Sequence, residues 1–351
     1  MRQQPVGSAR DFEPRRQVRF CTMPGGARVA YATVGHGPAL VLPAAWIGHL
    51  ELQWQDPALR RFLLPLAARR TVVQYDKPGC GLSDAWPDRL GFDGSVEVLR
   101  GVVDHLELDR FDLLGISEAG AVSLAYAARY PDRVGRLVVY GGYADGHQIG
   151  TPDVRTAVVG MVRAHWGLGS DVLADLFLPD ASAEMRAHFT RLQRHSATGE
   201  FAGELLAQCY ETHVDDVLDQ VKAPTLVLHR RDDRAIPYRL GRDLAARVPG
   251  ARLMSLPGRS HFPYAGDSGS VVRAILEFLG ETADAVPAGL TPRQLEVAAL
   301  VAEGLTNRQI AQRLGIEERS AEGHVERIRL RLGVTSRSQI AAWWARGGHG
   351  D

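Results

Sequence analysis

Short, nearly continuous apolar runs, separated by segments of helical periodicity, constrain the fold of this chain more than any other feature of its sequence. The runs ALVL, DLLGI, RLVVY and PTLVLH are typical of strands buried on both faces of a parallel sheet. We predict strands at 17–21, 28–34, 39–43, Thr71–Tyr75, Phe111–Ile116, Val134–Tyr140, 225–229 and 251–256.

Helical patterns fall between these strands, at 96–106, 119–129, 240–248 and Ser268–Phe278. Strands that alternate with helices predict a doubly wound α/β sheet. A mostly helical segment at about 144–221 interrupts the alternation. Because ligands of such sheets bind beyond the carboxyl ends of the strands, we expect this segment to form a lid over that edge.

The length of 351 residues is enough for about two domains. The chain has 41 basic and 41 acidic residues, so its formal net charge of zero argues against a protein coated in nucleic acid. Residues 286–351 contain nine arginines, no lysine and seven acidic residues, which is only a slight basic excess. We predict a disordered N-terminus at 1–16, an α/β domain at 17–280, a linker at 281–289 and a small all-α domain at 290–351.

The cysteines Cys21, Cys80 and Cys209 are too far apart for a zinc motif, and their odd number suits a reducing compartment. The first residues lack the apolar core of a signal peptide. No run approaches the roughly 18 apolar residues of a membrane span. We therefore expect a cytoplasmic protein without a membrane partner, a metal or a cofactor.

The C-terminal segment contains two helix-start signals. Thr291 precedes a proline and is followed three residues later by Gln294, and Thr306 is followed three residues later by Gln309. Gly315 ends the second helix, and a third helix is predicted from about Glu318 to Leu332. Short helices joined by a tight glycine turn form a helix-turn-helix.

At 100° per residue, one face of the third helix carries apolar residues that face the core: Ala321, Val325, Ile328 and Leu332. The opposite face carries Arg319, Gly323, Glu326 and Arg327. In a helix-turn-helix, this outward face enters the major groove of DNA. Four residues suit contacts with DNA phosphates: Arg319, Ser320, Arg331 and Arg337. Glu322 and Glu326 are suited to accept hydrogen bonds from cytosine.

The segments LTPRQLEV, EGLTNRQIAQRLGI, ERSAEGHVERI and RLGVTSRSQIAAW resemble the LuxR-type (NarL/FixJ) output domain over about 290–344. The resemblance implies binding to double-stranded DNA as a homodimer. It places the recognition positions at Arg319, Ser320, Glu322, Gly323 and Glu326. Two residues depart from the family pattern, because Glu317 replaces the usual serine N-cap and Ala321 replaces the usual valine.

The strand Phe111–Ile116 runs into Gly115-Ile116-Ser117-Glu118-Ala119-Gly120 and then a helix, which is the context of a nucleophile elbow. Ala119 stands where glycine is more usual. The acid and the base follow in chain order. Asp233 fits the acid position after the strand PTLVLH better than Asp232 does, and His261 follows the strand ARLMSL. We assign attack to Ser117, proton transfer to His261 and orientation of that histidine to Asp233.

An oxyanion that forms beside Ser117 needs backbone N–H donors. The N–H of Glu118 lies at the start of the predicted helix, whose N-terminus favours negative charge. A second donor is expected after the strand 39–43, and we assign it to Trp46.

From about Val18 to Phe278 the chain resembles the α/β-hydrolase superfamily, through YDKPGCGLSD, GISEAG, AARYPDRV, PTLVLHRRDDRAIP and LPGRSHF. The subfamily that it resembles most is found attached to regulatory domains. Arg230 departs from the pattern, since free hydrolases usually have glycine there.

Three hypotheses remain open at this point. The chain is a transcription regulator whose hydrolase domain senses a small ester, lactone or acyl ligand, and possible turnover of that ligand is left open. Alternatively, it is a serine esterase or lactonase with an accessory helix-turn-helix tail. In the third hypothesis, the hydrolase fold is a receptor that binds without turnover.

Overall fold

The computed structural model describes residues 16–86, 91–280, 290, 292–332, 334 and 336–345. The chain divides into two compact units, Met1–Leu279 and Gly280–Asp351. The predicted linker 281–289 and all of the predicted disordered segment except Arg16 lie outside the described residues. Arg16 donates a hydrogen bond of 2.9 Å to the carbonyl of Leu50.

An eight-stranded sheet forms the centre of the first unit, with the order β1-β2-β4-β3-β5-β6-β7-β8. The first two strands and their pairing with β4 are antiparallel, and all other neighbours are parallel. This arrangement confirms the predicted α/β sheet. The strands are β1 Gln17–Thr22, β2 Arg28–Gly35, β3 Ala39–Leu42, β4 Thr71–Tyr75, β5 Phe111–Ile116, β6 Val134–Tyr140, β7 Thr225–Arg230 and β8 Arg252–Leu256.

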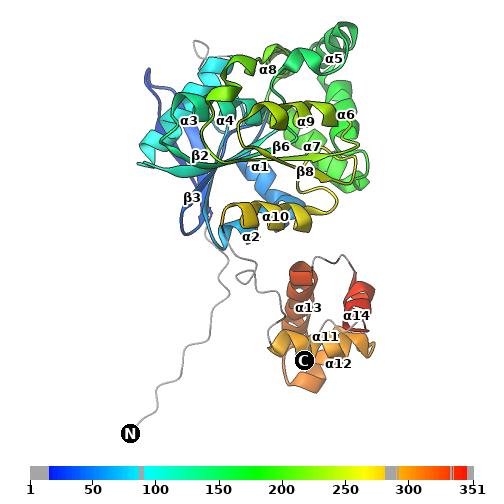
Figure 1. The fold of residues 1–351 in the computed structure, drawn as a ribbon. Coiled ribbons are helices and arrows are strands. Elements are labelled where there is room, and N and C mark those ends of the chain that lie inside the picture. The colour runs from blue at the N-terminus through cyan, green and yellow to red at the C-terminus, as the bar shows by residue number, and fades with distance from the viewer. Residues whose placement is uncertain are drawn as a thin grey trace. The chain divides into compact units, whose positions relative to one another are not determined.

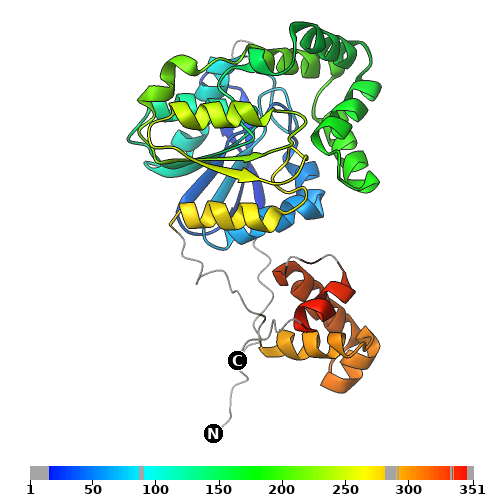
Figure 2. The same ribbon diagram turned by 45° about the vertical axis from the view of Figure 1, so that its right-hand side comes forward.

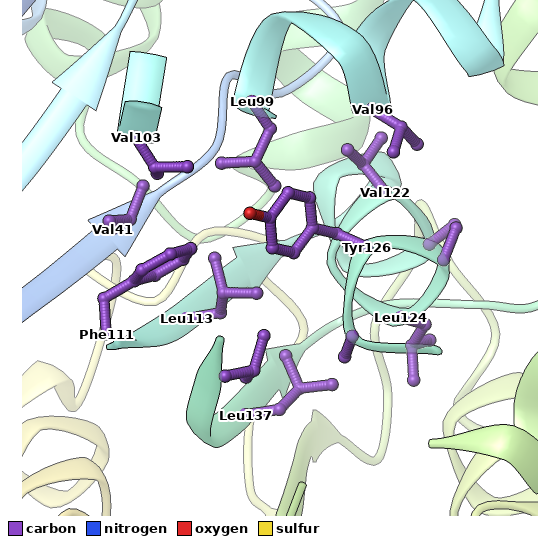
Figure 3. Packing of buried hydrophobic residues seen from close by; sticks show 14 of the residues in the cluster. Val41, Val96, Leu99, Val103, Phe111, Leu113, Val122, Leu124, Tyr126 and Leu137 are labelled. Atoms are coloured by element: carbon purple, nitrogen blue, oxygen red, sulfur yellow. The ribbon is translucent and has the colours of Figure 1, made fainter. Parts of the chain in front are cut away.

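Helices cover both faces of the sheet (Figure 1). One face packs against α3 Phe92–His105, α4 Glu118–Arg129 and α9 Tyr238–Arg247. The other face packs against α2 Pro57–Ala67 and α10 Ser268–Phe278. Figure 3 shows the first of these cores, where the buried ring of Tyr126 lies among side chains from α3, α4 and the strands. Burial on both faces explains the nearly continuous apolar runs in the strand sequences.

The segment between β6 and β7 forms a helical layer, as Figure 2 shows. It begins with the short helix η2 Gly146–Gln148, ends with η3 Asp215–Gln220, and contains α5 Pro152–Ala164, α6 Trp166–Phe177, α7 Ala183–Ser196 and α8 Gly199–Glu211. Side chains of α6, α7 and α8 share a core with Trp46 and Ile47 from the loop that follows β3. The segment expected to act as a lid is therefore packed against a loop at the carboxyl end of the sheet.

Two helices of the first unit were not predicted, α1 Leu50–Gln55 and α2 Pro57–Ala67. Their boundary has a clear local cause. Asp56 accepts a hydrogen bond of 2.8 Å from the N–H of Ala58, and a proline follows it at the first helical position. An Asp-Pro pair before an apolar run is a helix-start signal, so the sequence held the information for α2.

The second unit consists of α11 Pro292–Ala302, α12 Asn307–Leu314, α13 Glu318–Leu332 and α14 Arg337–Ala345. The predicted capping box of α12 is confirmed, since Thr306 and Gln309 exchange hydrogen bonds between side chain and backbone. Gly315 ends α12 in the left-handed conformation, with φ 63°. The predicted cap at Thr291 lies outside the described residues.

Three of the residues expected in the core of this unit are buried: Ala321, Val325 and Ile328. Leu332 packs against the same core and is partly buried. Among the described helices of the whole chain, none combines the length and the apolarity that crossing a membrane requires.

Candidate active site and recognition helix

Ser117 stands at the turn between β5 and α4, with φ 58° and ψ −129°. This backbone conformation is strained for a residue with a side chain and costs about 1–3 kcal/mol. The turn is held by hydrogen bonds of 2.9 Å from the N–H of Ser117 to the carbonyl of Tyr140 and from the N–H of Gly120 to the carbonyl of Ser117. Strain of this kind is typical of functional sites, where the surrounding fold holds a side chain in a fixed position.

Small neighbours make this turn possible. A Cβ atom at Gly115 would lie 2.6 Å from both the carbonyl oxygen of Ala119 and the hydroxyl of Ser123. Glycine is therefore required there. Ala119, where glycine was the more usual residue, is fully buried.

Asp233 and His261 meet from the loops that follow β7 and β8. The Nδ1 atom of His261 lies 2.8 Å from Oδ2 of Asp233, and both side chains are 1% exposed. The other carboxylate oxygen accepts hydrogen bonds of 2.9 and 3.0 Å from the backbone N–H groups of Ala235 and Ile236. Asp232, the neighbouring acid, is exposed. The buried carboxylate thus fixes the orientation of the imidazole.

Burial alone would raise the pKa of Asp233, but His261 and the N–H donors outweigh it and hold that pKa below its ordinary value. The carboxylate therefore stays charged at neutral pH. On the opposite side of the imidazole, Nε2 of His261 is buried and has no hydrogen-bond partner among the described residues. A buried ring nitrogen without a partner is costly in a purely structural histidine, and it is expected in one that exchanges a proton with a ligand.

Ser117 and His261 line the same cavity. Trp46 lines it as well, from the loop after β3. Glu118 is the first residue of α4, so its N–H lies at the positive end of that helix. Which N–H groups would bind an oxyanion stays a prediction for both Trp46 and Glu118.

The side chain of Glu118 has a separate role. Its two carboxylate oxygens lie 3.0 and 3.2 Å from the ammonium of Lys77, and both side chains are buried. Burial would lower the pKa of Lys77, but Glu118 outweighs burial and raises it. The pair is therefore a buried ion pair behind the elbow. Cys80 is also buried and its thiol pKa is raised to about 12, chiefly by burial.

Sequence reasoning did not assign a function to two groups around this site. Phe177, the last residue of α6, accepts a hydrogen bond of 2.8 Å from the N–H of His261 through its carbonyl. Arg230, which stands in place of the usual glycine, donates to Tyr140 Oη and to the carbonyls of Pro257 and Ala265, at 2.8, 2.8 and 2.6 Å. The departure at Arg230 was visible in the sequence, but its contacts were not.

Among the described residues, side chains of the types that bind metal ions are grouped at one place. Asp145, His213 and Asp215 bring three ligand atoms within 4.8 Å of one another. None of these residues lines the cavity of Ser117. The carboxylate of Asp215 is already paired with Arg247.

The predicted recognition residues on α13 differ in their exposure to solvent. Four residues are exposed there: Arg319, Ser320, Glu322 and Glu326. Gly323 is half-buried. Glu326 is paired with Arg329 at 3.0 Å. The side chains of Arg327 and Arg331 lie outside the described residues.

Arg337, which was predicted to contact DNA phosphate, makes hydrogen bonds within the second unit. Its guanidinium donates to the carbonyl of Leu305 and, at 2.7 Å, to Oδ1 of Asn307. It thereby ties the start of α14 to the turn before α12.

Comparison with protein families gives three matches along the chain. Residues 38–159 match the alpha/beta hydrolase fold, and residues 199–287 match a family described as TAP-like protein. Residues 288–344 match bacterial regulatory proteins of the luxR family. These matches bear out the fused architecture expected from the sequence.

Curated relatives match the first unit. A 2-hydroxy-6-oxononadienedioate/2-hydroxy-6-oxononatrienedioate hydrolase from Cupriavidus pinatubonensis is 30% identical over 278 residues, covering 75% of this chain and 95% of the relative. A 2-hydroxy-6-oxo-2,4-heptadienoate hydrolase from Pseudomonas putida is 28% identical over 262 residues, covering 70% and 86%.

Solved structures show the same fold. A hydrolase from Pseudomonas aeruginosa superimposes with a TM-score of 0.64 at 24% identity, covering 78% of this chain and 100% of the other. An enol-lactonase from Burkholderia xenovorans gives 0.63 at 24% identity, with 75% and 100% covered. A bromoperoxidase from Bacillus anthracis gives 0.68 at 20% identity, again with 75% and 100% covered.

Proposed function

Since the chain belongs to the α/β-hydrolase family and carries a luxR-family DNA-binding domain at residues 288–344, we propose that it is a transcription regulator controlled by a small molecule. The hydrolase unit binds an ester, lactone or acyl compound in the cavity beside Ser117 and His261. Occupation of the cavity changes the affinity of the luxR-family domain for its DNA site. A coupling of about 1–3 kcal/mol between the two binding events is enough for such control.

The observation that carries this proposal is the buried Asp233–His261 pair beside a strained Ser117, in the same chain as a helix-turn-helix. The imidazole has its Nδ1 bound to Asp233 at 2.8 Å and its Nε2 without a protein partner. A hydrolase fold kept only as a scaffold has no need for this costly arrangement.

The same residues suit turnover, although the described contacts include no hydrogen bond between the Ser117 hydroxyl and Nε2 of His261. His261 takes the hydroxyl proton of Ser117 as the serine oxygen attacks the acyl carbon, and Asp233 stabilises the imidazolium that forms. The developing oxyanion accepts hydrogen bonds from backbone N–H groups, for which we propose Glu118 and Trp46. His261 then gives its proton to the leaving oxygen, and water releases the acyl group by the reverse sequence.

The exposed face of α13 is the proposed DNA-reading surface, used by a homodimer on a two-fold site. Selection of duplexes from a random pool by the full chain, at about 150 mM salt, tests this. We expect one enriched sequence. Arg319→Ala should weaken binding to it by about tenfold or more, whereas Lys222→Ala, an equal charge change in the hydrolase unit, should not. Absence of any enriched sequence would remove the regulator function.

A second candidate is a serine hydrolase in its own right, favoured by the strained backbone of Ser117 and by relatives that are named as hydrolases. The hydrolysis of p-nitrophenyl acetate by the wild type and by Ser117→Ala separates it from a receptor that does not turn over its ligand. Equal rates would leave only the receptor.

A further inference from the structure

The described residues that line the cavity beside Ser117 include no carboxylate, ammonium or guanidinium side chain. Among them, His261 is the one basic side chain. The Nδ1 atom of that histidine is bound to Asp233. A carboxylate that enters the cavity would lose its hydration without gaining a cation, which is strongly unfavourable.

Two buried cations of the first unit, Lys77 and Arg230, already bind other groups. The ammonium of Lys77 is held by both oxygens of Glu118, and the guanidinium of Arg230 is used on Tyr140 and two backbone carbonyls. Neither Lys77 nor Arg230 lines the cavity. Their charges are therefore not available to a ligand unless contacts that hold the site together break.

Aromatic rings form one wall of the cavity. Phe177 lies between Trp46 and Phe262, with ring centroids 6.5 and 5.7 Å away, and Phe262 is stacked on Tyr264 at 5.1 Å. Such a wall favours a hydrocarbon or aromatic body through apolar contact. The wall comes from the lid helix α6, the loop after β3 and the loop that bears His261.

Two residues of the cavity lining have amide side chains. The side chains of Gln53, on α1, and Gln74, on β4, line the cavity. Neither side-chain amide has a hydrogen-bond partner among the described residues. An amide is suited to a neutral carbonyl or hydroxyl group of a ligand rather than to a full charge.

We infer that this cavity selects an uncharged ester or lactone with an apolar or aromatic body, and rejects esters and lactones that also carry an ionised carboxylate. This rests on the proposed function of the cavity and narrows its ligand class. It separates the chain from the first-named relative, whose printed substrates, nonadienedioates and nonatrienedioates, are dicarboxylates.

Two esters of matched chain length test the inference on the full chain. They are p-nitrophenyl valerate, which is neutral, and mono-p-nitrophenyl glutarate, which ends in a carboxylate. With the rate of Ser117→Ala subtracted, we expect kcat/KM to be about 100-fold higher for the valerate at neutral pH. Comparable values for the two esters would overturn the inference.

Introducing a positive charge into the cavity tests whether the lack of a cation causes the selectivity. Gln53→Arg places a guanidinium at the cavity. It should reduce the ratio of kcat/KM for the valerate to kcat/KM for the glutarate by about tenfold or more. Gln55→Arg, on the exposed side of the same helix, should leave the ratio unchanged. If both arginines changed the ratio equally, long-range charge rather than the cavity would set it, and the inference would fail.

Binding provides a readout that does not need turnover. The nitrophenyl group quenches tryptophan emission, so both esters can be titrated into Ser117→Ala. Tighter binding of the valerate supports the inference even if the protein is a receptor without activity. Equal binding, or binding of neither ester, would overturn it. Failure of the regulator function would appear separately, as absence of a selected duplex.

Discussion

The backbone carbonyl of Phe177 accepts a 2.8 Å hydrogen bond from the N–H of His261, and the centroids of the two rings lie 5.4 Å apart. Phe177 is the last residue of α6, within the helical layer between β6 and β7. One residue of this layer therefore supports both the backbone and the imidazole of the proposed base. A displacement of α6 that a ligand causes would reach His261 directly.

Removal of the Phe177 ring should slow the reaction of Ser117. In Phe177→Ala the imidazole loses its ring contact, and a poorly held base costs about tenfold or more in rate. The measurement is the rate of acylation by p-nitrophenyl acetate. Leu168→Ala, on the exposed side of α6, is the control. Unchanged acylation in Phe177→Ala would show that the lid does not hold His261 in position.

The acid can be tested against its neighbour. Asp233→Asn keeps the shape of the side chain but removes the charge that selects the tautomer of His261, so acylation should fall by about a thousandfold or more. Asp232→Asn changes the adjacent, exposed residue and should leave the rate within about twofold. Steady-state kinetics of the two variants checks both expectations. Similar rates would mean that Asp233 is not the orienting acid.

The central strands β3, β5 and β7 were predictable to within one or two residues because burial on both faces leaves a continuous apolar run. The helices α3 and α9 begin earlier than predicted, at Phe92 and Tyr238, since their first turns have little periodicity. The chain order Ser, Asp, His followed from the hydrolase motif, and spacing favoured Asp233 over Asp232. The capping box and the glycine turn likewise placed α12.

Contacts between distant segments could not be predicted. Phe177 and His261 are 84 positions apart in the chain. The hydrogen bond between them uses backbone groups, which every non-proline residue has, so the side chain at position 177 could not predict it. The role of Arg230 depends on carbonyls from two other loops. Gln53 and Gln74 reach the cavity through the packing of α1 and β4, and glutamines elsewhere in the chain look the same in sequence.

Arg230 should contribute to the stability of the hydrolase unit. Arg230→Met leaves the Tyr140 hydroxyl and the carbonyls of Pro257 and Ala265 without their donor, which should lower the free energy of unfolding by about 2–4 kcal/mol. Urea titration measures this, with Arg231→Met as the exposed control. Equal stability of the two variants would mean that water or other donors replace the guanidinium.

The stability of the hydrolase unit should depend on pH through Asp76. Burial raises the pKa of this carboxyl from 3.8 to about 6, although the N–H groups of Leu82 and Leu50 oppose the shift. The folded state thus binds the proton more tightly than the unfolded chain does. The resulting stabilisation is fully present below about pH 4 and is lost as the pH rises through about 6.

Asp76→Asn should remove this dependence. From pH 4 to pH 7, the wild type should lose about 1–3 kcal/mol of unfolding free energy relative to the variant. Urea titrations at several pH values compare the two slopes. Parallel slopes would show that Asp76 is ionised with an ordinary pKa in the folded protein.

Coupling between the two units can be measured with a covalent occupant of the cavity. Phenylmethylsulfonyl fluoride reacts with activated serines, and intact mass establishes modification of the wild type and its absence in Ser117→Ala. We then measure affinity for the selected duplex before and after treatment. We predict a change of about fivefold or more in the modified wild type and none in Ser117→Ala. Identical affinity of the modified and unmodified protein would contradict control of DNA binding by the hydrolase unit.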